Sequence, residues 1–201
     1  MNYTRSVLWH ERTRYLAGVV AVAFSATLIY LQFGMLLGLF SLTSTPIDHA
    51  TADIWISHPR VHSVDLGRPI PLRWQGRLAV QPEVVHTEAY LLGVVELEKP
   101  GQRPQLCTVI GPRLGEHSVG APRELTPRMR QLLSEKGAIV VDAADLGALG
   151  LTGVGDTAQV FGHRVKVVEV FRGGTLRSLA LPYLVCSVET ARWLLGRLTL
   201  N

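Results

Sequence analysis

The chain has 201 residues, a net charge of +4 and a pI near 9.4. Its basic residues are scattered and do not form the stripe with interleaved aromatic residues that single-stranded nucleic acid requires, so a nucleic-acid interface is excluded. The lysines are Lys99, Lys136 and Lys166, and none of them follows the glycine-rich loop of a Walker-type ATPase. The sequence therefore predicts that this chain does not hydrolyse ATP.

An uninterrupted apolar segment lies near the N-terminus. Residues Tyr15 to Ile47 include no Asp, Glu, Lys, Arg or His, and the 27 residues of Leu16–Leu42 are almost all apolar. A helix of that length extends roughly 40 Å, which exceeds the ~30 Å hydrocarbon core of a bilayer. The segment predicts a transmembrane helix over residues 15–42.

A cleaved signal peptide is the alternative interpretation of this segment. Signal peptides have an apolar region of about 7–15 residues, followed by a cleavage site with small residues. The apolar segment here is much longer, and residues 43–48 lack such a site. The sequence favours an anchor that stays attached.

The flanking charges predict the orientation of the anchor. The residues before it carry an excess of positive charge, from Arg5, Arg12 and Arg14, whereas the first charged residues after it are Asp48 and Asp53. The positive-inside rule places the N-terminus in the cytoplasm. We expect residues 1–14 to be a cytoplasmic or interfacial segment in contact with membrane lipid, and residues 43–201 to form a periplasmic domain on an inner (plasma) membrane.

Two glycines in the anchor have the spacing of a helix-packing motif. Gly34 and Gly38 lie on roughly one helical face with Thr27, Leu31 and Ser41. Small residues at this spacing let a second helix approach closely. Glycine is also common in membrane helices, so a chance spacing remains the alternative.

The part beyond the anchor alternates strand-like and helix-like segments. Val, Leu and Tyr runs bounded by turn residues predict strands, and capping residues such as Thr126 with Pro127 predict helices. The expected strands are 52–57, 83–98, 105–111, 138–142, 157–161, 164–171 and 181–187, and the expected helices are 72–80, 126–136, 143–149 and 189–195. This order predicts a mixed α/β (α+β) domain.

No set of residues in the sequence has the pattern of a catalytic or metal site. His58 and His62 have the i, i+4 spacing of a helical metal pair, but Pro59 places them in a loop. Asp142 and Asp145 are close in sequence, but Asp142 is better explained as a cap of the helix that follows. Cys107 and Cys186 both lie in strand-like segments, and we expect them to be buried and unpaired; a disulfide is the alternative. The sequence predicts no enzyme activity, cofactor or metal.

Four segments together resemble a known family. They are Gly137–Asp142 (GAIVVD), Leu149-Gly150-Leu151, Val154-Gly155-Asp156-Thr157 and Val165–Val168 (VKVV). Their order resembles the extracytoplasmic domain of MacB/FtsX-type ABC transporter permeases. Trp9–Arg14, Ala52–Ile56, Phe171–Gly174 and Pro182-Tyr183 are similar to the DevC-like branch. The resemblance implies a domain like the MacB periplasmic core.

The resemblance also implies a function. Such permeases have one N-terminal helix, an extracytoplasmic domain and three later helices, and this chain ends at Asn201. It resembles the N-terminal part of an export permease that pairs as a homodimer with a separate ABC ATPase and a periplasmic adaptor (membrane fusion) protein. The domain would relay conformational change between them. The alternative is a bitopic membrane-anchored domain that binds a partner protein or a small ligand.

The Gly155-Asp156 pair precedes the Thr157–Phe171 hairpin, which is the most family-like part of the domain, and there is a physical reason for both residue types. Glycine accepts a positive φ, and an aspartate side chain bonds to nearby amides, so the pair can reverse the chain into the hairpin that follows. We expect Gly153 to be less constrained than Gly155.

Overall fold

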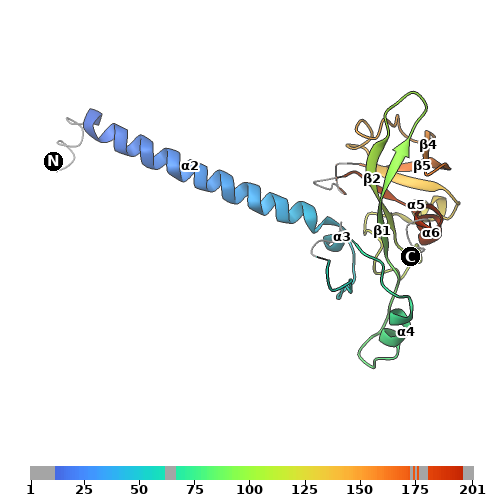
Figure 1. The fold of residues 1–201 in the computed structure, drawn as a ribbon. Helices are drawn as coiled ribbons and strands as arrows, with labels where there is room; N and C mark the ends of the chain where they lie inside the picture. Colours follow the sequence, from blue (N-terminus) through green and yellow to red (C-terminus); the bar gives the residue numbers. More distant parts are fainter. Residues whose placement is uncertain (1–11, 62–66, 173, 175, 177–180, 197–201) are drawn as a thin grey trace. The chain divides into compact units, whose positions relative to one another are not determined.

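The computed structural model describes residues 12–61, 67–172, 174, 176 and 181–196. Contacts within the chain divide it into two units, Met1–Ser41 and Leu42–Asn201. The first unit is dominated by helix α2 (Arg12–Thr43), drawn in blue in Figure 1. Its residues Tyr15–Thr43 form the one described helix that is long and apolar enough to cross a membrane. The first eleven residues of the expected cytoplasmic segment lie outside the described residues.

The second unit is built around a closed six-stranded barrel. Its strands are β1 (Leu91–Glu98), β2 (Gln105–Gly111), β3 (Ala138–Asp142), β4 (Thr157–Val160), β5 (His163–Phe171) and β6 (Tyr183–Val185). They follow one another around the barrel in the order β1-β2-β6-β3-β5-β4, and β4 pairs with β1 to close it. The β2–β6 and β3–β5 pairs are parallel and the others antiparallel.

Strand β3 shows why the barrel has two separate cores. All five of its residues are buried. Ile139 and Val141 belong to one hydrophobic cluster, whereas Ala138 and Val140 belong to the other. Successive side chains of a strand point to opposite faces. The first cluster fills one side of the sheet together with helix α6 (Val188–Leu195), and the second lies on the other side.

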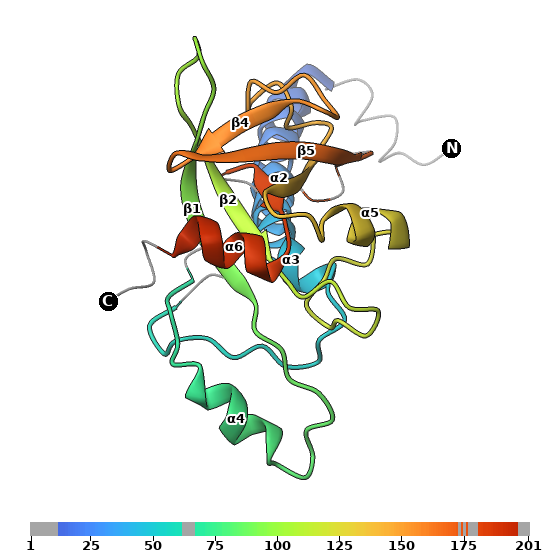
Figure 2. The same ribbon diagram turned by 90° about the vertical axis from the view of Figure 1, so that its right-hand side faces the viewer.

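The remaining helices are short: α3 (Thr45–Asp48), α4 (Arg73–Ala79) and α5 (Pro127–Leu132). The hydroxyl of Thr126 accepts the Met129 amide at the start of α5, as the capping pattern predicts. Ser187 caps α6 in the same way by accepting the Thr190 amide. Helix α4 has no buried residue and lies in an extension away from the barrel (Figure 2).

The structure confirms the mixed α/β fold, with an N-terminal apolar helix followed by a sheet domain. Both predicted hairpins are antiparallel pairs, β1–β2 and β4–β5. Cys107 and Cys186 are buried and unpaired, as expected. Ile110 on β2 pairs with Val185 on β6, so Cys186 lies level with Gly111, about 13 Å along the strands from Cys107. This separation is too long for a disulfide.

Several predicted elements are wrong. Residues 52–57 form no strand, because the segment lies outside the barrel without a neighbouring strand, and Ile54 is 79% exposed. Residues 143–149 form turns and no helix, and the carboxylate of Asp142 accepts the amide of Ala144 in a tight turn. Asp142 is therefore not a helix cap.

Other elements are shorter than predicted, among them β6, which covers three residues of the predicted strand 181–187. Helix α5 ends at Leu132, four residues before Lys136, and the chain continues through turns to Gly137. In the predicted strand over 83–98, pairing begins only at Leu91. The preceding residues lie in the extension, where no neighbouring strand is available to them in the described structure.

Candidate functional site

The Gly155-Asp156 pair forms a turn that is bonded to strand β5. Gly155 has a φ of 91°, and its amide donates to the Val167 carbonyl at 2.8 Å. The Val167 amide in turn donates to the Asp156 carbonyl at 2.9 Å. The turn therefore continues the edge of the β4–β5 hairpin and fixes where β4 begins.

The Asp156 carboxylate is the most heavily bonded acidic group near this turn. Oδ2 accepts the Lys99 ammonium at 2.6 Å and the amide and hydroxyl of Thr152 at 2.8 and 3.0 Å. Oδ1 accepts the Thr157 amide at 2.8 Å. The Lys99 hydrogen bond, followed by the bond from the Thr152 amide, holds the pKa of Asp156 well below its usual range. The side chain is only 14% exposed, so the charge is mostly removed from water.

Lys99 connects two loops that are distant in sequence. Its ammonium also donates to the Gly150 carbonyl at 3.1 Å. Gly150 has a φ of 65°, and a Cβ there would lie 1.8 Å from the Gln102 side-chain oxygen. The β1–β2 turn thus closes tightly over the loop before β4. The sequence around Lys99 does not indicate this role, because nothing local marks a partner 57 residues away.

The backbone of Gly153 is more constrained than the sequence suggested. Its φ is 139°, so it too adopts a conformation that L residues rarely take, and it is not the less constrained position that the sequence suggested. The cause is the Thr152–Asp156 loop, which turns twice within five residues. The Asp156 amide donates to the Gly153 carbonyl at 3.2 Å and closes the second turn.

The segment directly after helix α2 is bonded to a loop of the barrel domain. We call residues 44–51 the juxtamembrane segment. The Thr51 amide donates to the Val119 carbonyl, and Arg123 donates from its amide to the His49 carbonyl and from its guanidinium to the Ala50 carbonyl, each at 2.9 Å. His49 Nδ1 lies 2.6 Å from Glu124 Oε1. Several bonds therefore hold this segment to the 119–124 loop.

Glu88 also binds the loop that holds the juxtamembrane segment, through residues 118–120. Its carboxylate accepts the Ser118 hydroxyl at 2.7 Å and the amides of Val119 and Gly120 at 3.2 and 2.8 Å. The Glu88 side chain is 3% exposed. Because Glu88 lies three residues before the start of β1, a continuous set of hydrogen bonds leads from the juxtamembrane segment to the barrel.

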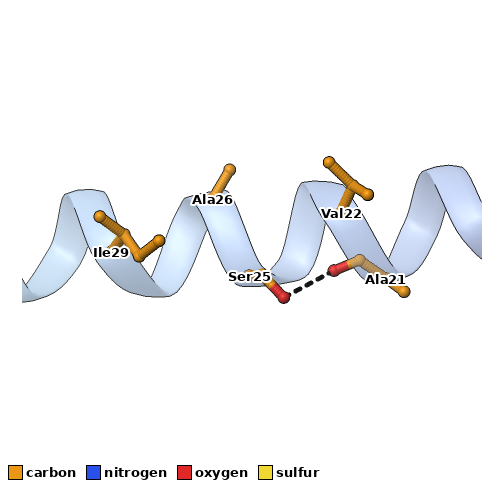
Figure 3. Close-up of a pocket in the computed structure, with 5 residues that line it drawn as sticks. All are labelled: Ala21, Val22, Ser25, Ala26 and Ile29. Carbon is orange, nitrogen blue, oxygen red and sulfur yellow. Dashed lines mark hydrogen bonds between the residues drawn. The ribbon is translucent and has the colours of Figure 1, made fainter.

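Gly34 and Gly38 of the anchor helix have free space beside them within the chain. A Cβ at Gly34 or Gly38 would meet nothing within 4 Å in the chain. A shallow pocket lies elsewhere on α2, lined by Ala21, Val22, Ser25, Ala26 and Ile29 (Figure 3). At about 100° per residue, this pocket lies on nearly the opposite side of the helix from the two glycines. The Ser25 hydroxyl donates to the Ala21 carbonyl at 2.9 Å, so the helix satisfies it internally.

The described residues include no metal-binding cluster. No group of three or more His, Cys, Asp or Glu side chains is placed to hold an ion in the part of the chain that the structure describes. His62, one of the loop histidines considered in the sequence, lies outside that part, as does Gly173 of the family-like segment. Burial raises the pKa of the Cys107 thiol to about 12, and burial followed by the nearby Glu189 raises that of Cys186. Neither thiol is therefore activated as a nucleophile.

Comparison with known proteins finds likeness among solved structures only. No protein-family model matches the chain, and no curated protein does. Among solved structures, the chain is similar to the extracellular domain of the noncanonic ABC-type transporter YknZ from Gram-positive bacteria. The TM-score is 0.42 and the identity 13%, and the alignment covers 63% of this chain and 67% of that chain.

Proposed function

We propose that this chain is the N-terminal part of an ABC transporter permease subunit of the MacB/FtsX type, in its DevC-like branch. In this proposal α2 spans the inner membrane with its N-terminus in the cytoplasm, and the barrel domain lies in the periplasm. The domain relays conformational change between an ATPase and an adaptor, and it performs no chemistry itself.

The bonded juxtamembrane segment is the observation that carries this proposal. A domain that relays conformational change needs its first residues after the membrane helix to be fixed to its fold. Residues 44–51 follow α2 directly and are held by Arg123, by the His49–Glu124 contact and by the Thr51 amide. A simple tether would be better served by a flexible linker rich in Gly and Ser. The observed bonding fixes the first residues after the anchor to the fold of the barrel unit, and this supports the proposed relay.

The family-like segments support the proposal in a second way. Leu149-Gly150-Leu151 and Val154-Gly155-Asp156 form the loop that the β1–β2 turn covers, and β4 and β5 form the hairpin that follows. The segments that resemble the permease family thus form one continuous piece of structure, the loop before β4 and the β4–β5 hairpin. The proposed partners are a separate ABC ATPase, a periplasmic adaptor protein and a second copy of the permease, together with membrane lipid.

Amide hydrogen exchange tests the relay. The chain would be purified in nanodiscs together with its ATPase and compared in nucleotide-free and vanadate-trapped forms. We expect the exchange of the Thr51 and Arg123 amides to change between the two forms, because both amides join the juxtamembrane segment to the loop. Identical exchange in both forms would favour the alternative, a bitopic anchored domain that binds a partner or a small ligand.

Protease accessibility tests the orientation. Protease added to sealed spheroplasts should digest the domain, because the basic flank of α2 is N-terminal. Protection of the domain in intact spheroplasts, with digestion after lysis, would reverse the proposed topology.

A further inference from the structure

An open pocket of about 470 Å³ lies next to the Gly155 turn and has no part in the proposed relay. Residues of β3, β4 and β5 line it, together with the loops that precede β3 and β4. Its volume falls in the range of small-molecule sites. The residues that matter for its chemistry are Lys136, Arg164 and Lys166, which are all exposed, and Glu135.

The barrel pairing places Arg164 and Lys166 on one face of β5, next to the loop that carries Lys136. Val165 and Val167 are buried in the barrel core, so Arg164 and Lys166 project to the other side of β5. Lys166 pairs with Thr157 on one side and with Ala138 on the other. The Lys166 amide donates to the Gly137 carbonyl at 2.8 Å, and this bond holds the Lys136 loop against β5.

Gly137 makes this close approach possible. It has a φ of 82°, and a Cβ there would lie 2.9 Å from the Arg164 carbonyl oxygen. A larger residue would push the loop away from β5. The backbone of Lys136 is therefore held next to β5 by the fold itself.

The charges in the pocket are poorly compensated. Of the described residues that line it, three are basic and one, Glu135, is acidic. Within the described structure, Arg164 and Lys166 form no side-chain hydrogen bond or ion pair. The Lys136 ammonium lies 4.4 Å from the centre of the Trp193 ring, a contact that leaves its charge uncancelled.

We propose that this pocket binds a small ligand that bears phosphate groups. A phosphate group carries more than one negative charge and offers three strong acceptor oxygens, which suits cations that arrive from the Lys136 loop and from two positions of β5. A carboxylate carries one charge and two oxygens and would leave part of the positive charge unmatched. The site is independent of the relay role, so either proposal can fail without the other.

Isothermal titration of the full chain with inorganic pyrophosphate tests the site, in nanodiscs of zwitterionic lipid at low salt. We expect saturable binding that is about tenfold weaker in the double variant Arg164→Gln/Lys166→Gln, since two exposed charge contacts are lost. The matched control, Arg68→Gln/Arg73→Gln, removes two exposed arginines of the α4 extension and should bind as the wild type does. Citrate, which offers carboxylates only, should bind more weakly than pyrophosphate.

Three results would overturn the proposal: no binding by the wild type, equal weakening in both double variants, or citrate binding as strong as that of pyrophosphate. Thermal melting of each variant shows whether it is folded. Lys136→Gln, in a loop outside the barrel strands, gives a second measurement at the same pocket, and unchanged affinity in that variant would also contradict the site.

Discussion

The ammonium of Lys99 lies 2.6 Å from the Oδ2 atom of Asp156, although the two residues are 57 positions apart in the sequence. This ion pair joins the β1–β2 turn to the loop before β4. It lies where β1 and β4 pair and close the barrel. It is largely shielded from water, with side chains 20% and 14% exposed. The pair therefore connects the two segments next to the β1–β4 pairing, and we call this Lys99–Asp156 ion pair the clasp.

The clasp predicts a specific dependence of stability on pH. The pKa of Asp156 is lowered in the folded state, so its stabilising contribution is complete above the unfolded value of about 3.9 and is lost as the pH falls further. Asp156→Asn should lower the free energy of unfolding at pH 7 by about 1–3 kcal/mol. The difference from the wild type should shrink below about pH 4. Thermal melting from pH 3 to 7 measures this, and a difference that stays constant with pH would contradict it.

The turn at Gly155 predicts a second loss of stability. Its φ of 91° is unfavourable for any residue with a Cβ, although a Cβ there would meet no atom within 4 Å. Gly155→Val should cost about 1–2 kcal/mol through the backbone alone and lower the Tm of the chain by several degrees. Gly153 does not serve as a comparison, because its φ of 139° is also positive. Gly115→Ala is the matched control, at an open position without positive φ, and a Tm equal to that of Gly155→Val would remove the strain argument.

Helix α6 approaches the barrel so closely that strand β2 needs a glycine. A Cβ at Gly111 would lie 2.2 Å from the Ala191 Cβ, and no flexible side chain can move aside there. Gly111→Ala should destabilise the domain by about 1–3 kcal/mol through overpacking. At Gly93 a Cβ would meet the flexible end of Leu195 instead, so Gly93→Ala should cost less. Urea unfolding of both variants measures the two losses of stability. A larger loss in Gly93→Ala than in Gly111→Ala would show that α6 moves easily.

Gly34 and Gly38 predict association of the anchor helix. Gly34→Leu and Gly38→Leu should each weaken self-association in a membrane two-hybrid assay, because the added bulk separates the helix backbones. Gly18→Leu is the control, as Gly18 lies on nearly the opposite side of the helix. Equal signals from all three variants and the wild type would show that the glycine spacing has no role in packing.

Local sequence patterns were sufficient where the physical cause is local. The charge-free length of Leu16–Leu42, the Thr126 cap and the apolar strand Ala138–Asp142 each depend on neighbouring residues, and the structure has a helix or strand at each. The predictions failed where tertiary context decides. Residues 52–57 have the composition of a strand, but the barrel closes without them.

The long-range features could not be predicted in this way. Closure of the barrel depends on pairing between β1 and β4, and the clasp depends on Lys99 meeting Asp156. The bonds of the juxtamembrane segment join His49 to Glu124, which are 75 residues apart. A single sequence carries no local signal for such pairs, since surface lysines and glutamates are common in every class of loop.

Purification of the chain from its native membrane under mild conditions tests the central claim most directly. The preparation would be assayed for vanadate-sensitive ATP hydrolysis, and its proteins would be identified by mass spectrometry. A permease subunit predicts co-purification of a Walker-type ABC ATPase in a fixed ratio, and no hydrolysis by the chain once that subunit is removed. Recovery of the chain without any ABC ATPase, or ATP hydrolysis that stays with the isolated chain, would contradict the account.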